Sequence, residues 1–199
     1  MFLSDVDIKK GVEAGSITIK PFNEARLQVA SYDVTLGNEF EVVDRHQIGA
    51  SDPARGIYPV TRKLMVPDGG EFVLHPGENV LGKQREFIGV NNEHLILLSG
   101  KSSLARVGLV VHNTAMLFNP GHYFYPTFEL VNSSNIPIIL RPGMPIAQLL
   151  FARLISPTSK EYMGENGVGR FSAENSNHFA LPKKKKVALK KKITKSKKK

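Results

Sequence analysis

Hydrophobic and polar residues alternate in short runs over most of the chain, the pattern of half-buried β-strands. From residue 63 these runs recur about every ten residues, with Gly, Pro and Asn between them. Such spacing favours a sandwich, a jelly roll or a barrel over alternating strands and helices. We predict strands at 63–66, 71–74, 79–83, 87–90, 95–98, 109–112, 127–132, 136–140 and 146–154.

The first part of the chain adds one helix and more strands. Residues 4–15 are predicted as a helix, because Ser4 can cap its start and Gly15 can end it. Alternation then predicts strands at 16–20, 27–37 and 39–43. Residues 44–61 are rich in turn formers and charge, which indicates a loop. The expected fold class is all-β, or mainly β, with a short N-terminal helix.

The end of the chain differs in composition from the rest. A chain of 199 residues is long enough for one domain with a sizeable core, which we place at residues 1–182. Within it, residues 156–180 are polar and contain glycine, and are predicted to form a C-terminal arm. Residues 183–199 are a low-complexity lysine-rich tail, predicted to be disordered.

The net charge of +9 comes from this tail. Residues 183–199 hold 11 of the 27 basic residues and no acidic one, which leaves 16 basic and 18 acidic residues elsewhere. The sequence Pro-Lys-Lys-Lys-Lys-Val at 182–187 is compatible with a nuclear-localisation or nucleic-acid patch. We favour general polyanion binding by the tail, because short basic runs match such patterns by chance.

Several classes of protein and site are excluded by what the sequence lacks. There is no cysteine, hence no disulfide framework and no thiolate metal site. No run of 18 apolar residues predicts a membrane span, and the start shows no secretory signal. We therefore expect no membrane partner and a cytoplasmic protein.

Candidate chemistry is concentrated in residues 100–129. Lys101, Ser102, Ser103 and Arg106 form a cationic, hydroxyl-rich run suited to phosphate, although Leu95 stands where a P-loop needs glycine. Glu129 lies in the apolar run 128–131, where a carboxylate is costly to ionise, as suits a proton carrier near neutral pH. The commoner alternative is a carboxylate that faces solvent while its neighbours face the core.

Four ordered motifs lie in this region: Gly-Lys-Ser-Ser-Leu-Ala-Arg-Val-Gly-Leu at 100–109, Thr114-Ala115, Asn119-Pro120-Gly121 and Phe128-Glu129-Leu130. Together they resemble the core of dCTP deaminases, relatives of the trimeric dUTPases. Further matches lie at 31–37, 74–78 and 140–144, so the resemblance covers residues 1–180. It implies a dUTPase-like distorted jelly-roll β-barrel and a homotrimer with active sites between subunits.

The resemblance also implies a mechanism without a transition metal. Zinc deaminases use a His-x-Glu and Pro-Cys-x-x-Cys signature, which a chain without cysteine cannot supply. By resemblance, Glu129 is the general acid and base, and Ser102 and the Ala115 carbonyl position the attacking water. Arg106 favours the developing negative charge. The expected products are dUTP and ammonia.

Substrate contacts are likewise implied by resemblance. Lys101 and Arg170 would address the triphosphate, with Mg²⁺ between phosphate oxygens rather than in a protein cage. The remaining contacts to dCTP or dUTP would come from Ser103, Asn119, Tyr162 and Glu174, with the arm 156–180 closing over the nucleotide.

Four positions depart from the family pattern. Asn119 replaces Asp, Phe124 replaces Gly, Lys101 replaces Arg and Glu174 replaces Gln. An amide cannot act as a base, so Asn119 favours simple deamination to dUTP over a bifunctional enzyme that continues to dUMP. The third alternative is an inactive nucleotide-binding regulator on the same fold, which Phe124 and Glu174 favour.

Overall fold

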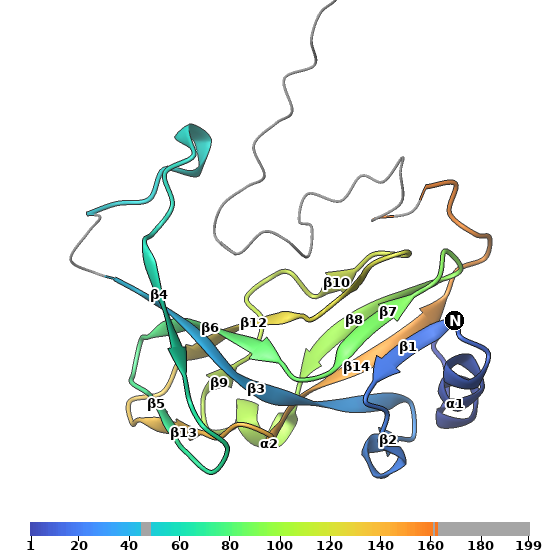
Figure 1. Cartoon of the computed structure of the whole chain (residues 1–199), viewed down its shortest axis with the longest axis horizontal. Helices are drawn as coiled ribbons and strands as arrows, with labels where there is room; N and C mark the ends of the chain where they lie inside the picture. The colour runs from blue at the N-terminus through green and yellow to red at the C-terminus, as the bar shows by residue number, and fades with distance from the viewer. Residues whose placement is uncertain (45–48, 161, 163–199) are drawn as a thin grey trace, which may run out of the picture.

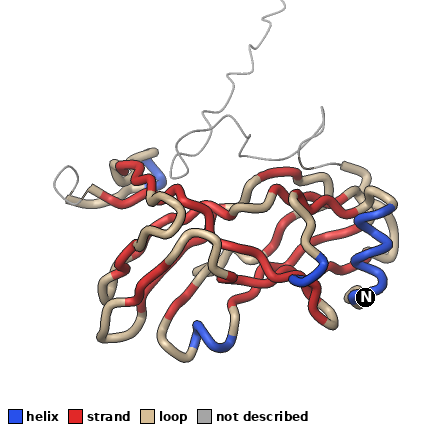
Figure 2. The backbone as a smooth tube through the Cα atoms, turned by 60° about the horizontal axis from the view of Figure 1, so that its bottom comes forward, coloured by secondary structure: helices blue, strands red, loops and turns tan. Residues whose placement is uncertain are grey.

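The computed structural model describes residues 1–44, 49–160 and 162 of the chain. In these residues, strands dominate and the helices are short and lie at the margins (Figures 1 and 2). The helices are α1 (Asp5–Glu13), η1 (Glu24–Arg26), η2 (Pro53–Arg55) and α2 (Ser102–Ala105). The strands are β1 (Ile17–Lys20), β2 (Leu27–Gln28), β3 (Ser31–Val43), β4 (Thr61–Met65), β5 (Phe72–Leu74), β6 (Asn79–Gln84), β7 (Phe87–Val90), β8 (His94–Gly100), β9 (Leu109–Val110), β10 (Leu117–Phe118), β11 (Tyr123–Phe124), β12 (Thr127–Asn132), β13 (Ile138–Leu140) and β14 (Pro145–Arg153).

A curled sheet forms the body of the molecule, with strand order β10-β8-β14-β3-β6-β12-β9 and with β2 and β4 also paired to β3. Smaller sheets, β1-β7-β11 and β13-β5, lie against it. The long strand β3 crosses much of the molecule and belongs to both halves of the main sheet (Figure 1). Its first half pairs with β14 and its second half with β4 and β6.

The change of partner along β3 coincides with an irregularity of the β3–β6 register between Leu36 and Phe40. Gly37 lies there, and a Cβ at this position would approach the Lys83 carbonyl oxygen to 2.7 Å. Glycine therefore permits the close approach of the two strands at the bend.

The core lies inside the curled sheet and is built from alternate residues of the strands. Its largest fully buried side chains include Tyr32, Phe40, Phe128 and Phe151. The N-terminal helix α1 contributes Ile8 to the same cluster. None of the helices in the described residues is long and apolar enough to cross a bilayer.

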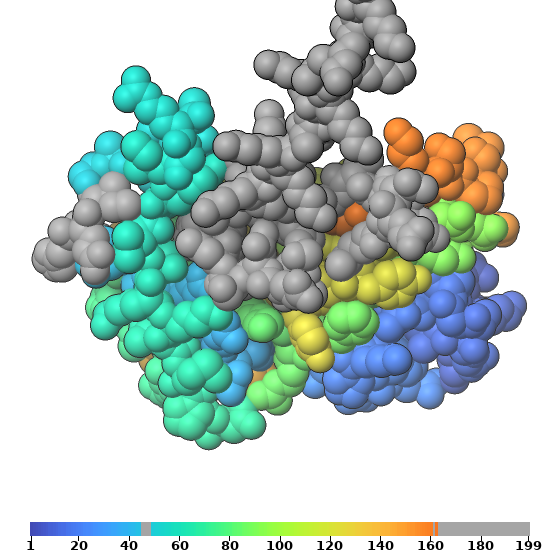
Figure 3. Space-filling model, turned by 45° about the horizontal axis from the view of Figure 1, so that its top comes forward, coloured from blue at the N-terminus to red at the C-terminus, as the bar shows by residue number. Residues whose placement is uncertain are grey.

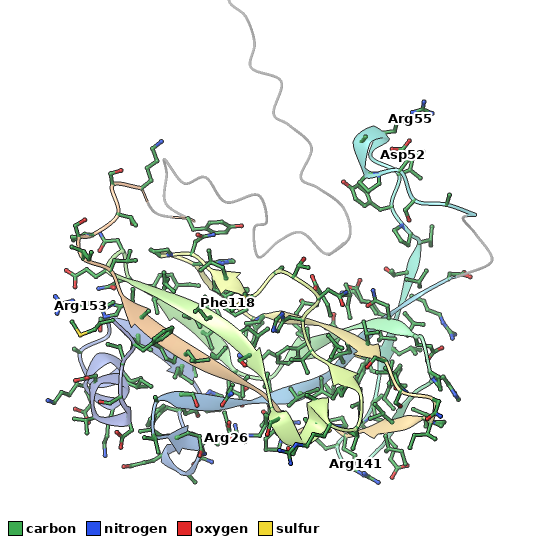
Figure 4. The ribbon with its side chains drawn as sticks, turned by 180° about the vertical axis from the view of Figure 1, so that it is seen from behind. Arg26, Asp52, Arg55, Phe118, Arg141 and Arg153 are labelled. Carbon is green, nitrogen blue, oxygen red and sulfur yellow. The ribbon has the colours of Figure 1, made fainter. Side chains whose placement is uncertain are left out.

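The mainly β fold with a short N-terminal helix is confirmed, and so are most of the predicted strands. The loop predicted at 44–61 is confirmed up to the start of β4: its described residues, 44 and 49–60, contain no strand, only the short helix η2 and the isolated bridge between Asp52 and Ile57. Asp52 caps η2 by accepting a hydrogen bond from the Arg55 backbone N–H. The part of this loop around η2 projects from the body and occupies one corner of the molecule (Figures 3 and 4).

Two regions of the prediction fall wholly or mostly outside the described residues. These are the tail at 183–199 and the arm at 156–180, of which the structure describes 156–160 and 162. Arg170 and Glu174 lie outside the described residues as well.

Candidate active site

The run 100–106 joins the end of β8 to the one-turn helix α2. The Lys101 carbonyl accepts hydrogen bonds from the backbone N–H groups of Leu104 and Ala105, at 3.0 and 2.9 Å. This turn leaves the side chains of Ser102, Ser103 and Arg106 exposed on the surface. In the part of the chain that the structure describes, no carboxylate forms an ion pair with the Arg106 guanidinium.

The turn ends at Gly108, whose φ of +89° lies in the left-handed region that favours glycine. Its carbonyl accepts hydrogen bonds from both the backbone N–H and the hydroxyl of Ser133, each at 2.9 Å. A Cβ at Gly108 would also approach Ser134 to 2.7 Å. The turn after α2 is thus attached to the turn that follows β12.

Lys101 is already paired within the chain. Its ammonium Nζ lies 2.5 Å from Oδ2 of Asp33, a residue of β3. The Asp33 side chain is 11% exposed and that of Lys101 is 26% exposed, so the pair is largely removed from water. The candidate phosphate ligand therefore points toward the sheet rather than into solvent.

Glu129 lies in the middle of β12, directly opposite Leu81 of β6. Its neighbours Phe128 and Leu130 are buried in the core, so Glu129 emerges on the other face of the strand, half-buried. Its Oε2 accepts a hydrogen bond of 2.8 Å from the Asn113 backbone N–H. The carboxylate is therefore held in place by the loop that leads to Ala115.

The turn Asn119-Pro120-Gly121 is the third part of the site. The Asn119 carbonyl accepts a hydrogen bond from the His122 backbone N–H at 3.2 Å, and the Asn119 side chain is exposed. The Tyr162 backbone N–H donates to the Pro120 carbonyl at 3.1 Å. The structure thus brings the beginning of the arm to this turn, although the two segments are far apart in sequence.

Four aromatic rings meet beside the turn. His122 stacks on Phe124 with 3.6 Å between centroids and 5° between planes, and Tyr162 lies 4.2 Å from His122. Phe118 packs edge-on against Phe124 at 5.1 Å (Phe118 is labelled in Figure 4). Burial lowers the pKa of His122 to about 4, so the ring is neutral at physiological pH. The aromatic run 122–125, in which alternate side chains share a face, was the signal that could have revealed this cluster.

The predicted site residues therefore form separate groups within one chain. Lys101, Ser102, Ser103 and Arg106 lie at α2, Glu129 is held by the loop that contains Ala115, and Tyr162 lies at the turn that contains Asn119. Among the described residues, no cluster of three or more His, Asp or Glu side chains is arranged to hold a metal ion.

Comparison with known proteins gives a consistent result. A family model described as dCTP deaminase-like matches residues 2–154. A Salinispora tropica protein named "dCTP deaminase, dUMP-forming" is 43% identical over 162 residues, which cover 81% of this chain and 84% of the relative. A Streptomyces avermitilis protein of the same name is 41% identical over 175 residues, covering 87% of this chain and 91% of the relative.

One solved structure shows the same fold. The 2′-deoxycytidine 5′-triphosphate deaminase from Agrobacterium tumefaciens superposes with a TM-score of 0.60 at 16% sequence identity. The match covers 77% of this chain and 48% of the other, so this chain spans about half the length of that protein.

The names of the relatives contradict the prediction that the reaction ends at dUTP. Both are described as forming dUMP, the product of the bifunctional alternative. The prediction was wrong because it treated Asn119 as decisive. An amide cannot take a proton from water, but it can orient a water molecule whose proton goes to another group.

Proposed function

Because the chain belongs to the dCTP deaminase-like family, we propose that it is a dUMP-forming dCTP deaminase. The overall reaction converts dCTP and two water molecules to dUMP, ammonia and pyrophosphate. The observation that carries the proposal is the identity of 43% with a dUMP-forming relative over most of both chains. The placement of Glu129 on a half-buried strand face, held by a backbone N–H, is compatible with it.

In the deamination step, water attacks C4 of the cytosine ring, and the C4–N bond to the amino group breaks. Glu129 takes a proton from the water and delivers protons to N3 and to the departing ammonia. Ser102 and the Ala115 carbonyl orient the water, and Arg106 stabilises the negative charge that develops. The bond from Asn113 to Glu129 supports this assignment, because Ala115 follows only two residues later.

In the second step, water attacks the α-phosphate, the bond from its phosphorus to the oxygen bridging to the β-phosphate breaks, and the departing pyrophosphate takes up the proton that the water loses. Asn119 would orient this water or the sugar without accepting the proton. Mg²⁺ would be carried by the triphosphate of the substrate, where it would offset negative charge. Ser103 and Tyr162 would contact the nucleotide, together with Arg170 and Glu174 from the part of the arm outside the described residues.

We further propose a homotrimer in which each active site lies between two subunits. The exposed side chains of α2 support this arrangement, since Arg106 has no carboxylate partner within the described chain. One subunit would supply Ser102 and Arg106, and its neighbour would supply Glu129. Light scattering should give a mass of three times 22.0 kDa; a fully active monomer would contradict the proposal.

The activity is tested by incubating the protein with dCTP and Mg²⁺ and separating dCTP, dUTP and dUMP by chromatography. We expect dUMP, ammonia and pyrophosphate in equal amounts. Accumulation of dUTP and ammonia without pyrophosphate would refute the second step, and unchanged dCTP would refute both.

We also propose that the enzyme acts in the cytoplasm and that residues 183–199 bind polyanions. Truncation after Pro182 should abolish retention on a polyanion column at low salt. Unchanged retention would refute the role of the tail.

A further inference from the structure

The ion pair between Lys101 and Asp33 is largely removed from water. Asp33 lies on β3, and as a whole residue it is only 8% exposed. Its Oδ2 receives the Lys101 ammonium at 2.5 Å and the Gln28 amide at 3.5 Å. Its Oδ1 is fully buried and has no hydrogen-bond partner among the described residues. A carboxylate in this position depends on its cation.

Lys101 is also the N-cap residue of α2, directly before its first residue Ser102. Its backbone carbonyl accepts the hydrogen bonds that form the first turn, and no side-chain cap supports that turn. A single helical turn is not stable by itself, because nucleation costs more than one or two hydrogen bonds return. Contacts with the rest of the protein must therefore fix the turn, and the Lys101–Asp33 pair joins its N-cap residue to the central strand β3.

Resting on the proposed function, we propose that Lys101 is a positioning residue rather than a ligand of the triphosphate. Its ammonium, held by Asp33, fixes the start of α2 and thereby the orientation of Ser102 and Ser103 toward the substrate. A direct role at the phosphates would require the ammonium to leave a buried carboxylate, which would then carry an uncompensated charge.

Because Oδ1 of Asp33 has no hydrogen-bond partner in the part of the chain that the structure describes, an arginine at position 101 could restore the attachment. The guanidinium of arginine carries several N–H donors in a planar fork that fits both oxygens of a carboxylate. Lys101→Arg should therefore preserve the attachment to Asp33. Lys101→Met keeps much of the length of the side chain but removes the charge, so it should lose the attachment.

The test compares Asp33→Asn, Lys101→Met, their double variant and Lys101→Arg in steady-state ammonia release from dCTP. We expect Asp33→Asn and Lys101→Met each to lower kcat by at least about tenfold, while KM for dCTP changes by less than about threefold. The double variant should be no worse than about twofold below the poorer single variant, because both changes break the same contact. Lys101→Arg should keep kcat within about threefold of the parent.

Lys9→Met is the matched control, since Lys9 forms an exposed ion pair with Glu24 at 2.6 Å, in α1. It should leave both constants unchanged. If Lys101 were instead a phosphate ligand, Lys101→Met would raise KM for dCTP at least about tenfold while Asp33→Asn would not. That result would overturn the proposal. If Asp33→Asn does not fold, the kcat and KM of Lys101→Met and Lys101→Arg still decide between the two roles.

A readout independent of turnover separates this proposal from the proposed function. Hydrogen exchange of the backbone amides of residues 104–106 should be at least about tenfold faster in Lys101→Met than in the parent or in Lys9→Met. If the parent protein releases no ammonia, the proposed function fails, but the exchange result still tests the anchoring of α2. Unchanged exchange would overturn the anchoring.

Discussion

The Glu129 carboxylate accepts a hydrogen bond from the Asn113 backbone N–H, with 2.8 Å between oxygen and nitrogen. The bond attaches β12 to the loop that continues to Ala115. Glu129, the candidate acid–base group, is therefore attached to the loop that carries the Ala115 carbonyl, the candidate group for orienting the attacking water.

Glu129→Gln should abolish ammonia release while leaving the fold intact. The amide oxygen can still accept the bond from Asn113, but the side chain can no longer carry a proton. We expect a loss of roughly 10²–10⁴-fold in kcat for ammonia release, the usual contribution of a general acid–base group. Glu13→Gln, at the exposed end of α1, is the control and should match the parent. Substantial ammonia release by Glu129→Gln would refute the assignment.

Two inactive variants should restore activity when they share a trimer. If Glu129 and Ser102 of one site come from different subunits, co-expressed Glu129→Gln and Ser102→Ala chains will form some sites with both native residues. Random mixing of equal amounts should give about one quarter of the parent activity, because each native residue is present at half of the sites. Absence of activity in trimers shown by mass spectrometry to be mixed would place both residues in one subunit.

Asn119→Asp should accelerate the second step more than the first. A carboxylate can accept the proton from the attacking water, which an amide cannot. Pyrophosphate release measured from dUTP should rise by at least about tenfold, a modest fraction of what a general base can contribute. Asn135→Asp, in the exposed turn after β12, should leave it unchanged. A fall in pyrophosphate release with Asn119→Asp would show that the amide has a role that a carboxylate cannot replace.

The stack of His122 on Phe124 should make stability depend on pH. The folded protein lowers the pKa of His122 from 6.5 to about 4, so the unfolded chain binds more protons between these values. The stabilisation is fully present above pH 6.5 and is lost as pH falls toward 4. After allowance for partial exposure of the ring, we expect a loss of roughly 1 kcal/mol between pH 7 and 5.

Urea unfolding at several pH values checks this expectation. His122→Phe keeps a ring against Phe124 but cannot titrate, so its stability should fall less than that of the parent over the same range. His75→Gln, in an exposed turn, should behave like the parent. If the free energy of unfolding falls equally with pH in the parent and in His122→Phe, the role assigned to His122 is contradicted.

The strands were predictable because alternation records which face of a strand meets the core, and β12 and β14 were placed nearly to the residue. The run at 101–106 and Glu129 were predictable only through ordered motifs. The partner of Lys101 was not, because Asp33 lies 68 residues away and nothing local indicates the pairing. The two-residue strands β10 and β11 and the one-turn helix α2 are too short for a periodic signal. Their conformations depend on contacts with the rest of the sheet.

The segment 101–108, which contains the short helix α2, is attached at both ends, to Asp33 through Lys101 and to Ser133 through Gly108. A segment held in this way has no separate melting transition, since it can lose its shape only when the strands that hold it come apart. Thermal inactivation should therefore coincide with the cooperative loss of the whole fold, and gentle warming below that temperature should leave turnover fully recoverable on cooling.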